Sequence, residues 1–166
     1  RPADDVFLMK YVNGKKEYSF SYEVASESLV PVTYIVRTSE KGEIKKEHQY
    51  IESISRCVDP YKDFDAFLSL ADNPDFRFVV SNTTEAGIAF DDNCKFDDKP
   101  CLSFPGKVTQ LLYKRYENGL GGFVLLPCEL IDSNGDELKK CVLQYADLWQ
   151  LPEGFKKWIN EENEFV

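Results

Sequence analysis

The sequence predicts a mixed α/β domain with a mainly parallel sheet flanked by helices, and two observations support this. From residue 61 onward, apolar patterns alternate in the order helix, strand, helix, strand, helix. Such alternation is typical of parallel strands joined by helices that cover the faces of a sheet. Residues 1–55 carry only β-prone runs, which predict an antiparallel region before the alternation starts.

The antiparallel region is expected to contain a β-hairpin near the N-terminus. Two β-prone runs, 6–12 and 17–24, lie on either side of Asn13 and Gly14. Asn-Gly between two such runs is a strong hairpin signal. Two further strands are expected over 30–38 and 43–54, with a turn at 39–43 between them.

The first helix and strand of the alternation are expected over 61–71 and 76–81. The helix carries apolar residues at helical spacing, which are Phe64, Phe67, Leu68 and Ala71. Asn73 and Pro74 end it, and the run Phe-Val-Val at 78–80 follows. A short run of aromatic and β-branched residues predicts a buried strand.

The second half of the alternation is expected to contain three helices and one strand. Pro105 is typical of a first helical turn, and Asn118-Gly119 is typical of a helix end. The segment 122–127 predicts a second buried strand, followed by a turn at 128–135. A long helix is expected over 136–149 and a short one over 153–160, separated by Leu151 and Pro152.

The composition excludes several classes of protein. The chain has 166 residues and is 43% hydrophobic, which indicates a globular domain. Its net charge of −9 argues against a nucleic acid or an anionic membrane as the partner, because both attract clustered Lys and Arg. No apolar run approaches the roughly 20 residues of a membrane span.

The cysteine pattern argues against a structural metal. Five cysteines occur at irregular spacings, without a Cys-x-x-Cys pair, and the chain has a single histidine. A zinc site normally needs four ligands at tight spacing. Free thiols in a reducing cytosol are therefore expected, and with them a cytoplasmic location.

Polar residues follow both predicted buried strands. Ser81 opens a polar segment after the first strand, and Cys128 opens another after the second. Open α/β sheets bind their ligands outside the carboxyl ends of their strands. The segment 132–136 also has some features of a calcium loop, but its glycine comes too early and no glutamate occupies the twelfth position. We therefore expect a ligand site without a metal at the two strand ends.

The phosphate-binding turn of a dinucleotide-binding sheet is missing from the sequence. No Gly-x-Gly-x-x-Gly occurs, and the Gly-Leu-Gly-Gly at 119–122 precedes a strand instead of following one. If the chain belongs to such a domain, its first strand–turn–helix unit is expected upstream.

Three blocks of residues resemble the tagaturonate reductase (altronate oxidoreductase) branch of the long-chain mannitol dehydrogenase family. They are Ser-Asn-Thr-Thr-Glu-Ala-Gly-Ile at 81–88, Lys-Phe-Asp-Asp at 95–98 with Ser-Phe-Pro-Gly-Lys at 103–107, and Pro-Cys-Glu-Leu-Ile-Asp at 127–132 with Asn134-Gly135. The match is close from about residue 64 to the end and weaker before residue 35.

The resemblance implies part of a Rossmann-like NAD-binding domain and an NAD-dependent reduction of D-tagaturonate to D-altronate by hydride transfer. It implies that residues 1–166 form a single partial domain. The glycine-rich unit would precede it, and the catalytic lysine would lie in a helical domain beyond it. The chain alone is then expected to be inactive, with the missing parts of its own polypeptide as partners. Fructuronate reductase, mannitol dehydrogenase and a non-catalytic α/β binding module stay open as alternatives.

The resemblance also suggests roles for the polar residues after the first strand. Ser81, Asn82, Thr83 and Thr84 are candidates for contacts with the nicotinamide end of NAD, because short polar groups offer both donors and acceptors. Capping of the next helix is the alternative. Glu85 is the candidate for a proton relay to the missing lysine, and a first-turn glutamate favoured by the helix dipole is its alternative.

The candidates for binding the sugar acid are Cys128, Glu129, Asn134 and Lys107. Carboxylate and amide groups suit sugar hydroxyls, and a lysine at a helix start suits a uronate carboxylate or a cofactor phosphate. The alternatives are a turn with a helix cap for the first three and a solvated side chain for Lys107.

Overall fold

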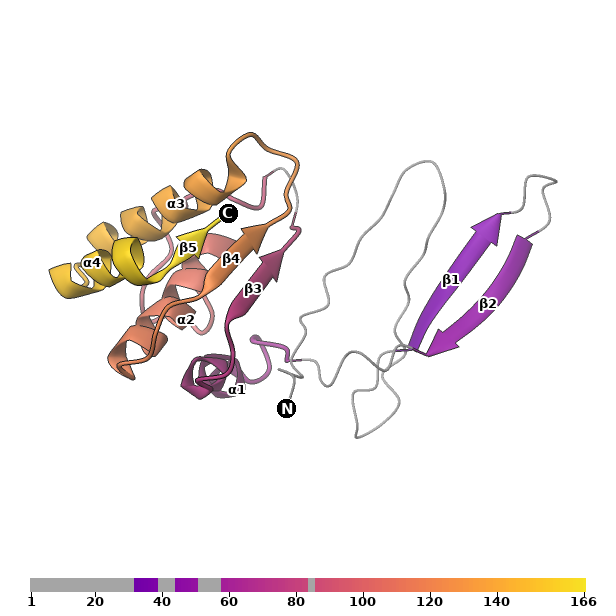
Figure 1. Ribbon diagram of the computed structural model, residues 1–166, viewed down its shortest axis with the longest axis horizontal. Coiled ribbons are helices and arrows are strands. Elements are labelled where there is room, and N and C mark those ends of the chain that lie inside the picture. Colours follow the sequence, from indigo (N-terminus) through magenta and orange to yellow (C-terminus); the bar gives the residue numbers. More distant parts are fainter. Residues whose placement is uncertain (1–31, 39–43, 51–57, 84–85) are drawn as a thin grey trace. The chain divides into compact units, whose positions relative to one another are not determined.

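The computed structural model describes residues 32–38, 44–50, 58–83 and 86–166. The chain divides into two compact units, Arg1–Cys57 and Val58–Val166. Figure 1 labels the elements of both units. The expectation that residues 1–166 form a single domain stays a prediction.

The first unit contains two antiparallel strands, β1 (Val32–Thr38) and β2 (Ile44–Tyr50). Val32 lies opposite Tyr50, and Thr38 lies opposite Ile44. Strands therefore lie within the expected ranges 30–38 and 43–54, and they run antiparallel. The hairpin expected around Asn13 and Gly14 lies outside the described residues.

The second unit is built on a three-stranded parallel sheet with the order β3-β4-β5. Its strands are β3 (Phe78–Ser81), β4 (Val124–Pro127) and β5 (Glu164–Phe165). In the register of the sheet, Phe78 pairs with Val124 and Leu125 pairs with Phe165. The prediction of a parallel sheet is confirmed for β3 and β4, whereas β5 was not predicted.

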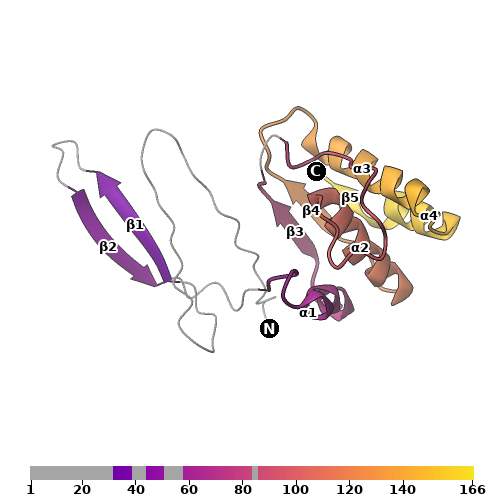
Figure 2. The ribbon, with the colours of Figure 1, turned by 180° about the vertical axis from the view of Figure 1, so that it is seen from behind.

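The helices of the second unit are α1 (Phe64–Ser69), α2 (Phe104–Glu117), α3 (Asn134–Leu148) and α4 (Glu153–Glu162). A short 3₁₀ helix, η1 (Leu70–Asp72), continues α1. Right-handed crossovers place α2 and α3 on the same face of a sheet ordered β3-β4-β5. The front and back views agree with this arrangement (Figures 1 and 2).

The core lies between that face and the helices. The apolar side chains that α2 and α3 bury include Val108, Leu111, Leu112, Leu138, Cys141, Val142 and Tyr145. From the strands, Leu125 is fully buried. The prediction of two buried strands is only half right, because Phe78 and Val80 of β3 are 51% and 53% exposed.

Local sequence signals explain where α2 begins and ends. The Ser103 hydroxyl accepts a hydrogen bond from the Gly106 backbone N–H at 3.0 Å, as an N-cap residue does. Pro105 sits in the first turn, where its missing N–H leaves no helical hydrogen bond unmade. Gly119 follows the helix with a φ of +66°, a conformation that glycine adopts without strain.

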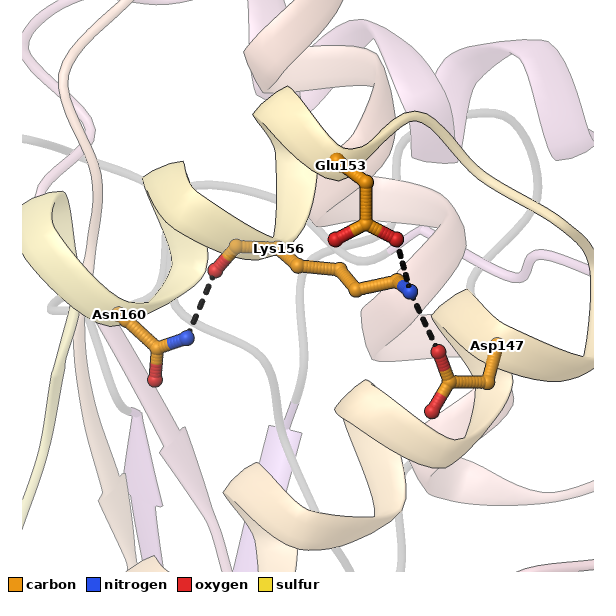
Figure 3. Close-up of polar contacts among 4 residues, drawn as sticks. All are labelled: Asp147, Glu153, Lys156 and Asn160. Carbon is orange, nitrogen blue, oxygen red and sulfur yellow. Dashed lines mark hydrogen bonds and ion pairs between the residues drawn. The ribbon is translucent and has the colours of Figure 1, made fainter.

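The last two helices are joined by a lysine placed between two carboxylates. Lys156 Nζ of α4 lies 2.6 Å from Glu153 Oε1 in its own helix and 2.5 Å from Asp147 Oδ1 in α3 (Figure 3). Asn160 Nδ2 donates to the Lys156 backbone carbonyl one turn later. The ion pairs therefore link α3 to α4 across the break at Leu151 and Pro152. None of the described helices is both long and apolar enough to cross a membrane.

Candidate functional site

Two polar turns meet where β3 and β4 end. Ser81 pairs with Pro127 in the parallel register, and the Cys128 backbone N–H donates to the Ser81 carbonyl at 2.7 Å. Because parallel strands end at the same edge of their sheet, the segment after Ser81 and the segment after Pro127 lie side by side. This confirms the predicted proximity of the two turns.

The side chain of Glu129 joins the two turns. Its Oε2 accepts a hydrogen bond from Ser81 Oγ at 3.2 Å. Its Oε1 accepts two more, from the Thr83 backbone N–H and from Thr83 Oγ1, both at 2.9 Å. Glu129 is only 4% exposed, and Ser81 only 2%. A buried carboxylate is stable when hydrogen bonds replace its water, and these three donors do so.

The second turn is also held together by its own hydrogen bonds. Asn134 Nδ2 donates to the backbone carbonyls of Pro127 at 2.8 Å and Glu129 at 3.1 Å. The side-chain oxygen of Asn134 accepts from the Gly135 backbone N–H at 2.9 Å. Asn134 therefore holds the turn together, whereas the N-cap residue of the helix is Ser133, which makes no side-chain capping hydrogen bond. A contact between Asn134 and a sugar stays a prediction.

The remaining candidates after β3 and β4 differ in accessibility. Asn82 and Thr83 are half-buried, and Cys128 is exposed. Thr84 and Glu85 lie outside the described residues, so the cofactor and proton-relay roles suggested for them stay predictions. Among the described polar residues here, Asn82 and Thr83 reach the surface, whereas Ser81 is buried.

Lys107 is engaged elsewhere in the unit. Its Nζ donates to the Leu102 carbonyl at 2.8 Å and lies 5.1 Å from the centre of the Tyr61 ring. No hydrogen bond or ion pair within residues 58–83 and 86–166 joins Lys107 to the two turns. A hollow of about 190 Å³ lined by Phe64, Phe96 and Tyr113, among others, likewise contains no residue of the turns.

The described residues contain no group of three or more His, Cys, Asp or Glu side chains that could hold a metal ion. Sequence reasoning selected Ser81, Thr83 and Glu129 individually but missed that they bond to one another. The available signal was their position at the ends of two neighbouring parallel strands, because residues at such ends are close in space.

The sequence matches the model of the mannitol dehydrogenase Rossmann domain family over residues 30–166. Over 153 residues, or 90% of the chain, it is 44% identical to the altronate oxidoreductase of Shigella sonnei. The altronate oxidoreductase of Escherichia coli O139:H28 shows the same identity over the same length. The chain spans about a third of the length of these relatives, since the matches cover 32% of each.

Solved structures of two sugar-alcohol dehydrogenases share the fold. A D-sorbitol dehydrogenase in substrate-free form matches 78% of the chain with a TM-score of 0.62 at 22% identity. A Pseudomonas fluorescens mannitol 2-dehydrogenase, in a ternary complex with NAD and D-mannitol, matches 81% with a TM-score of 0.60 at 20% identity. The matches cover 29% of each of these structures. With the family model matching well over half of its length, the chain belongs to the mannitol dehydrogenase Rossmann domain family.

Proposed function

We propose that the chain forms part of the NAD-binding domain of an oxidoreductase that reduces D-tagaturonate to D-altronate. The observation that carries the proposal is the pair of polar turns side by side at the carboxyl ends of β3 and β4. In open α/β sheets this is the place where ligands bind. The identity of 44% with altronate oxidoreductases supports the choice of substrate.

The residues after β3 fit the nicotinamide end of NAD. That end carries a carboxamide and ribose hydroxyls, which need both donors and acceptors from the protein. Asn82 offers its side-chain amide, and Thr83, whose hydroxyl proton and backbone N–H go to Glu129, offers its hydroxyl oxygen as an acceptor. Both residues are half-buried, where a flat ring can be shielded from water while its polar groups are met. Bound NADH would supply the hydride, and Thr84 and Glu85 continue the same polar segment.

The sugar acid would bind beside the second turn. Cys128 is exposed there, and Asn134 begins the helix that follows. Ser81 takes a supporting part, since its hydroxyl is buried and donates to Glu129. Lys107 would meet the uronate carboxylate or a cofactor phosphate only by leaving the Leu102 carbonyl.

The further parts of the proposal concern the rest of the polypeptide and the compartment. The chain would act together with other segments of its own longer polypeptide, in keeping with relatives about three times its length. The four described cysteines are free thiols, which supports a reducing, cytoplasmic location.

The test is an assay of the full-length protein that carries this sequence. NADH oxidation at 340 nm is followed with D-tagaturonate, D-fructuronate and D-fructose, and we expect the highest kcat/KM with D-tagaturonate. The 166-residue chain serves as the control and is expected to show no turnover. A preference for fructuronate or fructose would refute the substrate, and no NADH oxidation with any of the three would refute the proposal as a whole.

A further inference from the structure

We infer that Glu129 is a positioning residue that holds the turn after β3 in its binding geometry, and that it does not bind the sugar acid. The inference rests on the proposed function, in which Asn82 and Thr83 contact the nicotinamide end of NAD. It replaces the role of sugar ligand that the residue type suggested for Glu129.

The carboxylate is directed into the protein. Glu129 is 4% exposed, and both of its oxygens accept hydrogen bonds from the neighbouring turn, two on Oε1 and one on Oε2. A carboxylate has about four lone-pair sites, so three are already used. No ion pair within residues 58–83 and 86–166 involves Glu129. One site at most is left for a sugar hydroxyl, on a side chain that is almost fully buried.

The side chain continues the sheet beyond the point where backbone pairing stops. The last hydrogen bond between the two strands joins the Cys128 N–H to the Ser81 carbonyl. The next residue along, Glu129, then reaches across with its side chain to the backbone N–H of Thr83. The last residue of β3, Ser81, and a residue of the turn after it, Thr83, are therefore both attached to the second turn by one side chain.

This attachment fixes the residue between them. Asn82 is flanked by Ser81 and Thr83, and both neighbours donate to the Glu129 carboxylate. The backbone at residue 82 is thus held on each side, although β3 has already ended. Groups preorganised in this way bind a ligand without first being ordered, and a small displacement of such groups costs affinity or rate.

The test compares two substitutions of Glu129 in the full-length protein. Glu129→Ala removes all three acceptors. Glu129→Gln keeps an oxygen for Thr83 and puts an amide N–H beside Ser81, whose hydroxyl can accept as well as donate. We expect Glu129→Ala to raise KM for NADH about tenfold or more while KM for the keto acid changes less than about threefold. Glu129→Gln should stay within about threefold of the parent for both.

A matched control removes a buried polar link at the other end of β4. Asn163 Oδ1 accepts from the Phe123 backbone N–H at 2.9 Å, and Asn163 is 9% exposed. Asn163→Ala should lower stability and leave both KM values near those of the parent. The inference fails if both Glu129→Gln and Glu129→Ala raise KM for the keto acid about tenfold or more, because that result indicates a carboxylate that contacts the sugar acid. It also fails if Asn163→Ala reproduces the effect of Glu129→Ala.

Hydrogen exchange separates the inference from the proposed function. The Thr83 amide should be protected in the parent protein and in Glu129→Gln, and it should exchange faster in Glu129→Ala. This measurement needs no substrate. If the parent protein shows no activity with NADH, the proposed function fails and the exchange of Thr83 still decides the positioning role. Unchanged protection in Glu129→Ala would overturn it.

Discussion

Replacing Arg115 by lysine tests whether a buried guanidinium holds the second unit together. Arg115 is 2% exposed; its Nε donates to the Gly121 carbonyl at 2.8 Å and its Nη1 to the Asn73 carbonyl at 2.6 Å. Its guanidinium carbon lies 4.4 Å from the centre of the Phe123 ring. One side chain thus joins the end of η1, the end of α2 and the segment that leads into β4.

The expected loss follows from these contacts. A hydrogen bond from a charged donor contributes about 1.5–3 kcal/mol, and a desolvated cation–π contact about 2 kcal/mol. Lysine ends in a single nitrogen, so it cannot place donors at the separate positions that Nε and Nη1 of Arg115 occupy, and we expect it to keep one of these two hydrogen bonds. Losing one hydrogen bond and part of the ring contact gives a destabilisation of about 2–4 kcal/mol. That is a large share of the roughly 5–15 kcal/mol by which a domain is stable.

Urea unfolding of the 166-residue chain, followed by tryptophan fluorescence, measures this loss. Trp158 is a local reporter, because its indole N–H donates to the Leu120 carbonyl beside Gly121. Arg77→Lys is the matched control: Arg77 is exposed and lies over the Phe78 ring at 5.5 Å, so its replacement should cost less than about 1 kcal/mol. If the two variants lose equal stability, the buried fork of Arg115 is not what joins these segments.

Two further predictions concern pH and backbone contact. Burial raises the pKa of Tyr145 to about 12 from its ordinary 10.0, and that of Cys101 to about 12 from 9.0. The stability that both neutral groups contribute is therefore present below pH 9 and lost as the pH rises towards 12. The urea midpoint of unfolding should fall between these pH values. In Tyr145→Phe it should fall by less, because one of the two titrating groups is gone. A Cβ on Gly122 would lie 2.0 Å from the Glu162 carbonyl oxygen, whereas one on Gly121 would meet nothing within 4 Å. Gly122→Ala should therefore lower the free energy of unfolding by about 1–3 kcal/mol or more, and Gly121→Ala by less than about 0.5 kcal/mol. Equal melting temperatures for the two variants would refute this prediction, because they would show that the backbone moves to accommodate the Cβ at residue 122.

The helix–strand alternation could be predicted because each element carries its own local signal. α2 has a capping serine, an early proline and a terminal glycine, and its predicted start lies within one residue of the observed one. β5 could not be predicted, because its two residues show no periodicity. It forms through main-chain hydrogen bonds from Glu164 to Phe123 and from Val166 to Leu125, which depend on the rest of the chain being folded.

The helix α3 begins two residues earlier than the local sequence predicts, and a tertiary contact explains the difference. The sequence predicts that Asn134 and Gly135 lie in the turn, since both residues favour turns. In the structure the helix begins at Asn134, and Gly135 lies inside its first turn. A Cβ at Gly135 would lie 2.6 Å from the Val166 carbonyl oxygen. The glycine is required by close packing against the C-terminal residues, which the local sequence does not reveal.

Glu129 shows the same limit for the candidate site. Because Glu129 follows a predicted strand, the sequence correctly places it at the carboxyl edge of the sheet. The residue type then suggested a sugar ligand, because a carboxylate accepts hydrogen bonds from hydroxyls. The structure shows that the hydroxyls of Ser81 and Thr83 are the ones it accepts from. Sequence can identify an acceptor at a site, but only the fold shows which donors reach it.

Two apolar side chains of β3, those of Phe78 and Val80, are exposed on one face of the sheet. Phe78 and Val80 point to the face of the sheet opposite Leu125, and Val124 and Leu126, their partners in the register, are half-buried. Strands with apolar residues on both sides are typical of parallel sheets with both faces covered. The described helices α2 and α3 lie on one face only. The composition of β3 therefore suits a sheet with a second covering layer, which accords with a chain that spans about a third of its altronate oxidoreductase relatives.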